Sequence, residues 1–170
     1  MKPAPFFYIE LIPFFWLNIA IFVVIMESAD EKYMREALKE AQQAFNEGEI
    51  PVGAIIVSKD RIVARAHNLT QRLNDPTAHA EMQAVTSATH AIGGKYLNDC
   101  TLYITLEPCV MCAGALFWAQ IGRIVYGASD PKRGYKLVEK NLLHPKTIVE
   151  SGVLEKECAA LLTTFFKGKR

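Results

Sequence analysis

The sequence predicts an α/β protein, a three-layer α/β/α sandwich around a mixed sheet of about five strands. Stretches with apolar residues at helical spacing alternate with short β-rich runs along most of the chain. The first two runs are separated by only a tight turn, which favours an antiparallel hairpin. The later runs are separated by helix-length segments, which allow parallel crossovers. A chain of 170 residues can bury the core of one such domain, whereas two would be cramped.

Each expected element follows from its own residues. Residues 30–47 carry an apolar stripe and stop at Gly48, as an amphipathic helix does. Runs 52–57 and 62–67 flank the polar turn 58–61 and form the hairpin. The remaining order is helix 78–91, strand 101–106, helix 109–120, strand 123–126, a polar loop-rich insert at 130–146, strand 147–149 and a closing helix at 153–167.

Residues 1–26 differ from the rest of the chain. Between Phe6 and Met26 the sequence is almost wholly apolar, interrupted by Glu10, Pro13 and Asn18. A misplaced start is the favoured explanation, since Met26 opens a natural beginning for a domain at 27–170. A membrane anchor within residues 6–26 is the second explanation, although Glu10 and Pro13 weaken a span. A signal peptide is the third, but the positive region is thin and no clear cleavage site follows.

Composition and charge limit the compartment and the partners. The net charge is +1, so no global basic field demands nucleic acid, and any RNA contact must come from a local patch. There are four cysteines, and two of them, Cys109 and Cys112, are expected to bind metal, which argues against a disulfide scaffold. We therefore expect a reducing compartment and a cytoplasmic protein, with a membrane-anchored form as the alternative that residues 6–26 leave open.

Two short motifs carry the chemistry: His79-Ala80-Glu81, and Pro108-Cys109-Val110-Met111-Cys112. Together they offer three zinc ligands, one short of the closed shell of a structural site, and catalytic zinc keeps such a position for water. The cation lowers the pKa of that water, which then attacks an electron-poor carbon. Glu81 is the expected proton carrier, because a carboxylate used as fourth ligand would leave no place for water.

The spacing also predicts how the ligands are held. Cys109 and Cys112 are three residues apart, which places both sulfurs on one face of a first helical turn, with Pro108 at the first helical position. Asp75 or Thr77 is expected to cap the helix that bears His79 and Glu81. Two helix N-termini would then converge on one metal at the edge of the sheet, and their dipoles would favour thiolates.

Two other interpretations of the cysteines are weaker. A structural zinc ribbon needs a second Cys-x-x-Cys pair, but Cys100 and Cys158 are isolated and are expected to be ordinary buried thiols. A thioredoxin-like redox pair would leave His79 and Glu81 unexplained. The catalytic zinc site is therefore the preferred interpretation.

From residue 33 to residue 166 the chain resembles the cytidine-deaminase-like superfamily of zinc enzymes and, within it, the bacterial tRNA-specific adenosine deaminases. The resemblance is carried by residues 50–54, Asn68, 75–81, 101–115, and the tail 157–162 with Phe165 and Phe166. It implies hydrolytic conversion of adenosine to inosine at the wobble position of tRNA, one Zn²⁺ per subunit, and a homodimer with the anticodon stem-loop across its boundary.

The same resemblance assigns roles to individual residues. It makes His79, Cys109 and Cys112 the zinc ligands and Glu81 the proton shuttle. It gives substrate contacts to five residues: Asn68 to the flipped base, Ala80, Asp130, and the aromatic pair Phe165 and Phe166. Asn68 and the aromatic pair also have plainer interpretations, since Asn is common in turns and an aromatic pair on a closing helix is often core. The basic end at Lys167, Lys169 and Arg170 is expected to meet phosphate or to be a solvated helix end.

Two departures keep an alternative function open. The insert at 132–140 differs from the familiar pattern, which leaves the choice of tRNA unsettled, and Phe117-Trp118-Ala119 is similar to guanine deaminases. A small-molecule nucleobase or nucleoside deaminase, acting on guanine or cytosine, is the second hypothesis. The third is an idle zinc scaffold or anchored binding module, which would have no need of Glu81.

Overall fold

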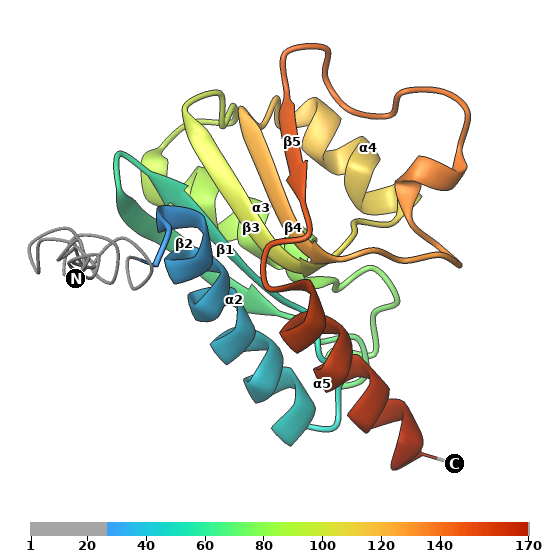
Figure 1. Ribbon diagram of the computed structural model, residues 1–170. Helices are drawn as coiled ribbons and strands as arrows, with labels where there is room; N and C mark the ends of the chain where they lie inside the picture. The colour runs from blue at the N-terminus through green and yellow to red at the C-terminus, as the bar shows by residue number, and fades with distance from the viewer. Residues whose placement is uncertain (1–26, 170) are drawn as a thin grey trace, which may run out of the picture.

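A computed structural model describes residues 27–169 and places a five-stranded sheet at the centre of the protein (Figure 1). The strands are β1 (Gly53–Ser58), β2 (Arg61–His67), β3 (Cys100–Leu106), β4 (Arg123–Ala128) and β5 (Ile148–Ser151). Their order across the sheet is β2-β1-β3-β4-β5. β1 is antiparallel to both of its neighbours, whereas β3, β4 and β5 are parallel. The expected mixed sheet is therefore confirmed.

Helices cover both faces of this sheet. α3 (Ala80–Ile92) and α4 (Val110–Trp118) bury alanine and leucine side chains on one face, in a core to which every strand of the sheet contributes. α2 (Ala29–Asn46) and α5 (Glu155–Lys167) pack on the other face, where a second core forms. Figure 1 shows α2 and α5 side by side, and their far ends meet through Phe45 and Phe165. The three-layer sandwich predicted from the sequence is thus confirmed.

Local sequence explains where the first elements begin and end. Ser28 accepts from the backbone of Glu31, whose side chain in turn accepts from the backbone of Ser28, and this capping box starts α2. Gly48, with φ of 79°, turns the chain away after the helix. Lys59 and Asp60 both have positive φ, as a two-residue turn between twisted antiparallel strands requires.

The strand directions bring three distant segments to one edge of the sheet. β2 and β3 are each antiparallel to β1, so they run the same way, and β4 is parallel to β3. The chain leaves β2 at Asn68, leaves β3 towards Cys109, and leaves β4 towards Asp130. These three residues therefore lie near the same edge, which is where α3 and α4 begin.

The helix starts differ from the sequence prediction. His79 and Cys109 are themselves the N-cap residues of α3 and α4, both with extended backbone. Neither Asp75 nor Thr77 caps α3, because the Asp75 carboxylate accepts from the backbone and the hydroxyl of Thr77 in a local turn. Pro108 precedes the cap rather than opening α4, and its carbonyl accepts a hydrogen bond from a later loop.

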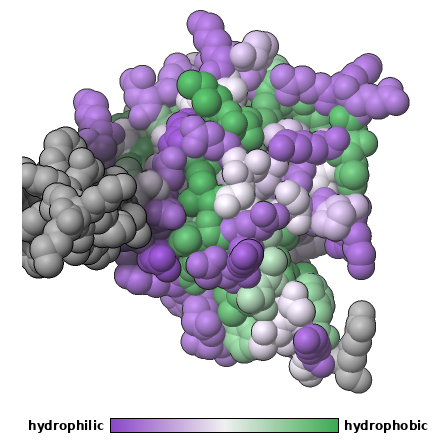
Figure 2. Space-filling model, in the orientation of Figure 1, coloured by the Kyte–Doolittle hydropathy of each residue, from purple (hydrophilic) through white to green (hydrophobic). Residues whose placement is uncertain are grey.

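Three further sequence predictions concern the insert at 130–146, a membrane span and residues 1–26. The insert contains one unforeseen 3₁₀ turn, η1 (Tyr135–Leu137). Within residues 27–169 no helix is long and apolar enough to cross a membrane. The predictions for residues 1–26 lie outside the described part of the chain. Figure 2 shows the surface in the orientation of Figure 1. Hydrophilic residues cover much of it, and apolar residues are visible between them, including some on α5.

Candidate zinc centre

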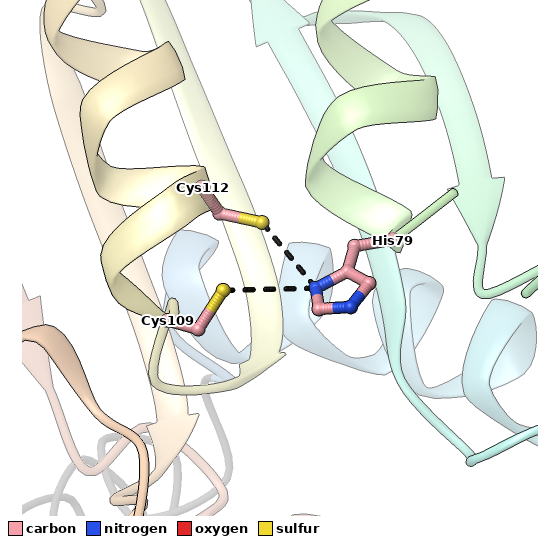
Figure 3. A group of neighbouring side chains, drawn as sticks. All are labelled: His79, Cys109 and Cys112. Atoms are coloured by element: carbon pink, nitrogen blue, oxygen red, sulfur yellow. Dashed lines mark hydrogen bonds between the residues drawn. The ribbon is translucent and has the colours of Figure 1, made fainter. Parts of the chain in front are cut away.

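Two helix N-termini meet at His79, Cys109 and Cys112, as the spacing predicted (Figure 3). His79 Nδ1 lies 3.7 Å from the Cys109 Sγ and 3.5 Å from the Cys112 Sγ. The three ligand atoms all lie within 4.8 Å of one another. Among residues 27–169, no other group of histidine, cysteine and acidic side chains gathers closely enough to share a metal.

These separations fit zinc. In a tetrahedral site with Zn–S of about 2.3 Å and Zn–N of about 2.0 Å, nitrogen and sulfur ligands stand about 3.5 Å apart. The two sulfur–nitrogen distances, 3.5 Å and 3.7 Å, equal that value or slightly exceed it. Two thiolates and one neutral imidazole would also balance the charge of the ion. Three protein ligands leave the fourth position of the tetrahedron for water.

The electrostatics of the metal-free site favour thiolate at Cys109. The Cys112 thiol donates a hydrogen bond to Cys109, and this bond lowers the pKa of Cys109. Burial raises the pKa, but a second hydrogen bond, with His79, lowers it further, and the result is a pKa of about 4. The same hydrogen bond and burial raise the pKa of Cys112. The pKa of His79 is raised, first by its hydrogen bond to Cys109, while the positive charge of Arg133 acts in the opposite direction. A cation at this point would replace the shared protons.

Glu81 lies in the first turn of α3, beside the ligands but outside their group. Its side chain is 4% exposed. Burial, with a smaller contribution from the negative Cys109, raises the pKa of Glu81 to about 7 in the metal-free chain. A carboxyl group with a pKa near neutrality can both accept and return a proton, which is what the sequence interpretation requires of it.

Asn68 and Ala80 meet at the base of the site. The Asn68 side chain is 5% exposed, and its Oδ1 accepts the backbone N–H of Ala80 at 2.9 Å. This contact fixes the amide, so its nitrogen is the atom that can donate to a base. The Ala80 side chain lies in the core beneath α3. Its connection to a substrate therefore runs through the Asn68 that it orients.

The remaining predicted contacts are more scattered. Asp130 follows β4, and its Oδ1 accepts the backbone N–H groups of Lys132 and Arg133, which shapes the loop there. Phe165 is buried and packs edge-on against Phe45, as its plainer interpretation as a core residue expects. Phe166 is 48% exposed and is free to stack on another group.

Two buried carboxylates near the site were missed from the sequence. Glu49 is 1% exposed and accepts from Thr70 Oγ1 and from the backbones of Gln71 and Arg72, in the loop after Asn68. Burial opposes its ionisation, but these donors outweigh burial and lower the pKa of Glu49. Glu107 is 6% exposed and accepts from the loop after β4. No sequence signal marks either one, because their partners lie more than twenty residues away.

Comparison with known proteins agrees with this geometry. Residues 27–128 match the family model of the cytidine and deoxycytidylate deaminase zinc-binding region. The tRNA-specific adenosine deaminase of Bacillus subtilis (strain 168) is 46% identical over 146 residues, which cover 83% of this chain and 91% of that enzyme. The match therefore spans nearly the whole of that enzyme.

Among solved structures, a tRNA deaminase is more similar to this chain than a guanine deaminase is. The tRNA deaminase structure comes from studies of A-to-I editing by tRNA:A34 deaminases at the wobble position of transfer RNA. It is 42% identical with a TM-score of 0.72, covering 77% of this chain and 99% of that one. The guanine deaminase of Bacillus subtilis is 40% identical with a TM-score of 0.57, covering 61% of this chain and 66% of its own. The second likeness is thus less complete.

Proposed function

Because the chain belongs to the cytidine and deoxycytidylate deaminase family of zinc-dependent hydrolases, we propose that it converts adenosine to inosine at the wobble position of tRNA. The observation that carries this proposal is the identity of 46% to a tRNA-specific adenosine deaminase over 91% of that enzyme's length. Within this scheme, residues 27–170 form the catalytic domain.

The proposed mechanism assigns one task to each side chain. His79, Cys109 and Cys112 would hold Zn²⁺, which when bound supplies the Lewis acidity that makes water nucleophilic near neutral pH. Glu81 accepts a proton from the attacking water, as its high pKa and its place beside the ligands allow. Glu81 returns this proton to the purine ring and then carries a second proton from the new hydroxyl group at C6 to the amino group. The C6–N bond breaks, ammonia leaves, and the water oxygen remains at C6 as the carbonyl of inosine.

The substrate contacts complete the proposal. The target base must leave the anticodon stack to reach a site at the sheet edge. Asn68, held by Ala80, donates from its amide nitrogen to the flipped base. Asp130 and the exposed Phe166 flank the incoming nucleotides, since an exposed ring can stack on an unstacked base. Phe165 supports Phe166 from the core through an edge-on contact.

A homodimer and a cytoplasmic location belong to the same proposal. The outer face of α4 is apolar, with Val110 48%, Met111 37% and Trp118 78% exposed, which supports a second copy of the chain as its cover. A molecular mass in solution of twice the chain mass is the expected result. Thiol ligands and a tRNA substrate support a reducing, cytoplasmic compartment.

The test is ammonia release and inosine formation by the zinc-loaded protein. The substrate is an anticodon stem-loop with adenosine at the wobble position, and the matched control is the same stem-loop with cytidine there. Free guanine, adenine, cytosine and cytidine are assayed in parallel. Turnover of the adenosine stem-loop alone supports the proposal. Turnover of a free base alone would instead favour a small-molecule deaminase. The similarity to the guanine deaminase structure is the observation that supports this alternative.

A further inference from the structure

Glu107 stands out among the groups around the zinc centre that the proposed mechanism does not use. It directly follows β3, and the residue is only 6% exposed. A carboxylate buried to this degree is stable only where donors replace water. Its Oε2 accepts the backbone N–H of Asp130 at 3.1 Å, and its Oε1 accepts that of Lys136, also at 3.1 Å. Both oxygens are thus committed to the two ends of one segment, which we name the 130–136 loop.

The 130–136 loop is also attached to the turn that carries the ligands. The backbone of Tyr135 donates to the carbonyl of Pro108 at 2.9 Å, and Gly134 forms an isolated β-bridge with Cys109. Gly134 has no room for a side chain, because a Cβ there would overlap the Glu107 carboxylate and lie 2.6 Å from the carbonyl oxygen of Asp130. The loop, the carboxylate and the ligand turn therefore form one packed unit.

The loop presents positive charge beside the site. Asp130 accepts from the backbones of Lys132 and Arg133, which leaves both basic side chains exposed at the tip. Arg133 directly precedes Gly134, the residue that bridges to Cys109. Lys136 at the base of the loop lies over the Tyr126 ring at 5.0 Å. The backbone of Arg133 is therefore fixed next to the turn that carries Cys109, and its side chain is exposed to solvent there.

We propose that Glu107 is a positioning residue that fixes the 130–136 loop so that Arg133 meets a phosphate of the RNA next to the reacting nucleotide. The inference rests on the proposed function, because it takes RNA as the substrate. A cation carried on a loop whose backbone is fixed before binding loses less conformational freedom on contact with phosphate than one on a free loop. Glu107 thus acts on substrate affinity rather than on the chemical step.

Glutamine is the informative replacement. Glu107→Gln keeps the size of the side chain but offers one acceptor where two are needed, and it turns an amide donor towards a backbone N–H. We expect the KM for the stem-loop to rise about tenfold while kcat changes less than about twofold. Zinc content should remain at one per chain. Glu139→Gln is the matched control, since Glu139 is an exposed acid close by, and it should change none of these quantities.

Two further variants separate positioning from general damage. Gly134→Ala should raise KM in the same way, because the added methyl group pushes the loop off an intact Glu107. Arg133→Ala should raise KM in the wild-type background but add little in the Glu107→Gln background, since the arginine is already misplaced there. Such non-additivity is the signature of two residues acting through one contact.

The same proteins are then compared without substrate. Hydrogen exchange at the amides of the 130–136 loop should speed up in Glu107→Gln and stay slow in Glu139→Gln. Wild-type KM in Glu107→Gln, additive effects with Arg133→Ala, or loss of zinc would each overturn the inference. If the wild-type protein neither binds nor deaminates the stem-loop, the proposed function fails first and the inference falls with it. In that case, faster hydrogen exchange in Glu107→Gln would show only that Glu107 anchors the 130–136 loop, and not that the loop binds RNA.

Discussion

Replacing the proposed proton shuttle should separate activity from stability in this protein. Glu81→Gln preserves the shape of the side chain but removes its ability to accept a proton. General acid–base catalysis contributes about 10²–10⁴-fold to a rate, so kcat on the stem-loop should fall by at least about a hundredfold. Zinc should stay bound at one per chain, because Glu81 lies outside the three-residue ligand group.

Although Glu81→Gln should lose activity, we expect it to be more stable than the wild type when both proteins are free of metal. Burial raises the pKa of Glu81 from 4.5 to about 7, so the folded chain binds this proton more tightly than the unfolded chain does. The ionised carboxylate therefore opposes folding, and its cost grows as pH rises from 4.5 and is complete above about 7. At about 1.4 kcal/mol per pH unit across that window, the full cost is about 3 kcal/mol. Glutamine carries no such cost.

The assay is urea unfolding of chelator-treated wild-type and Glu81→Gln protein between about pH 5 and pH 8. The variant should be more stable by about 3 kcal/mol at the alkaline end and by little at the acid end. Glu139→Gln, which changes an exposed carboxylate, should follow the wild type throughout. Parallel pH profiles for wild type and Glu81→Gln, or turnover that persists in the variant, would refute the reasoning.

Three other results are expected. Cys109→Ala should lose zinc and, with it, thermal stability relative to the zinc-loaded wild type, and unchanged metal content would disprove the ligand assignment. The hydrogen bond from Arg123 lowers the pKa of Asp30, so this carboxylate stabilises the fold above its ordinary pKa of 3.8. Acid unfolding should therefore show the stability gap between wild type and Asp30→Asn closing as pH falls through the lowered value. Gly53→Ala should cost about 1–3 kcal/mol in denaturant unfolding, because the methyl group would overlap the backbone of α2. Gly94→Ala, with nothing within 4 Å of the added group, should change stability by less than about 1 kcal/mol.

The zinc centre could be predicted from the sequence because its determinants are local. Cys109 and Cys112 lie within one turn whatever the rest of the chain does, and the ligand types restrict the metal by their own chemistry. The alternation of helical and strand-like patterns was likewise sufficient for the layers and the mixed sheet. The predicted helix caps were wrong in detail, because two hydrogen bonds from Thr77 decide that Asp75 closes a turn and does not cap a helix.

What only the tertiary structure decided is which distant groups meet around that centre. The partners of Glu107 lie 23 and 29 residues further along the chain, and those of Glu49 lie 21 to 23 residues away. The hydrophobic periodicity of the sequence cannot predict such pairs, because they form only when the ends of β2, β3 and β4 reach the same edge of the sheet. The sequence therefore determined the metal ligands and the reaction class, while the strand order determined which loops frame the site and which buried charges hold them.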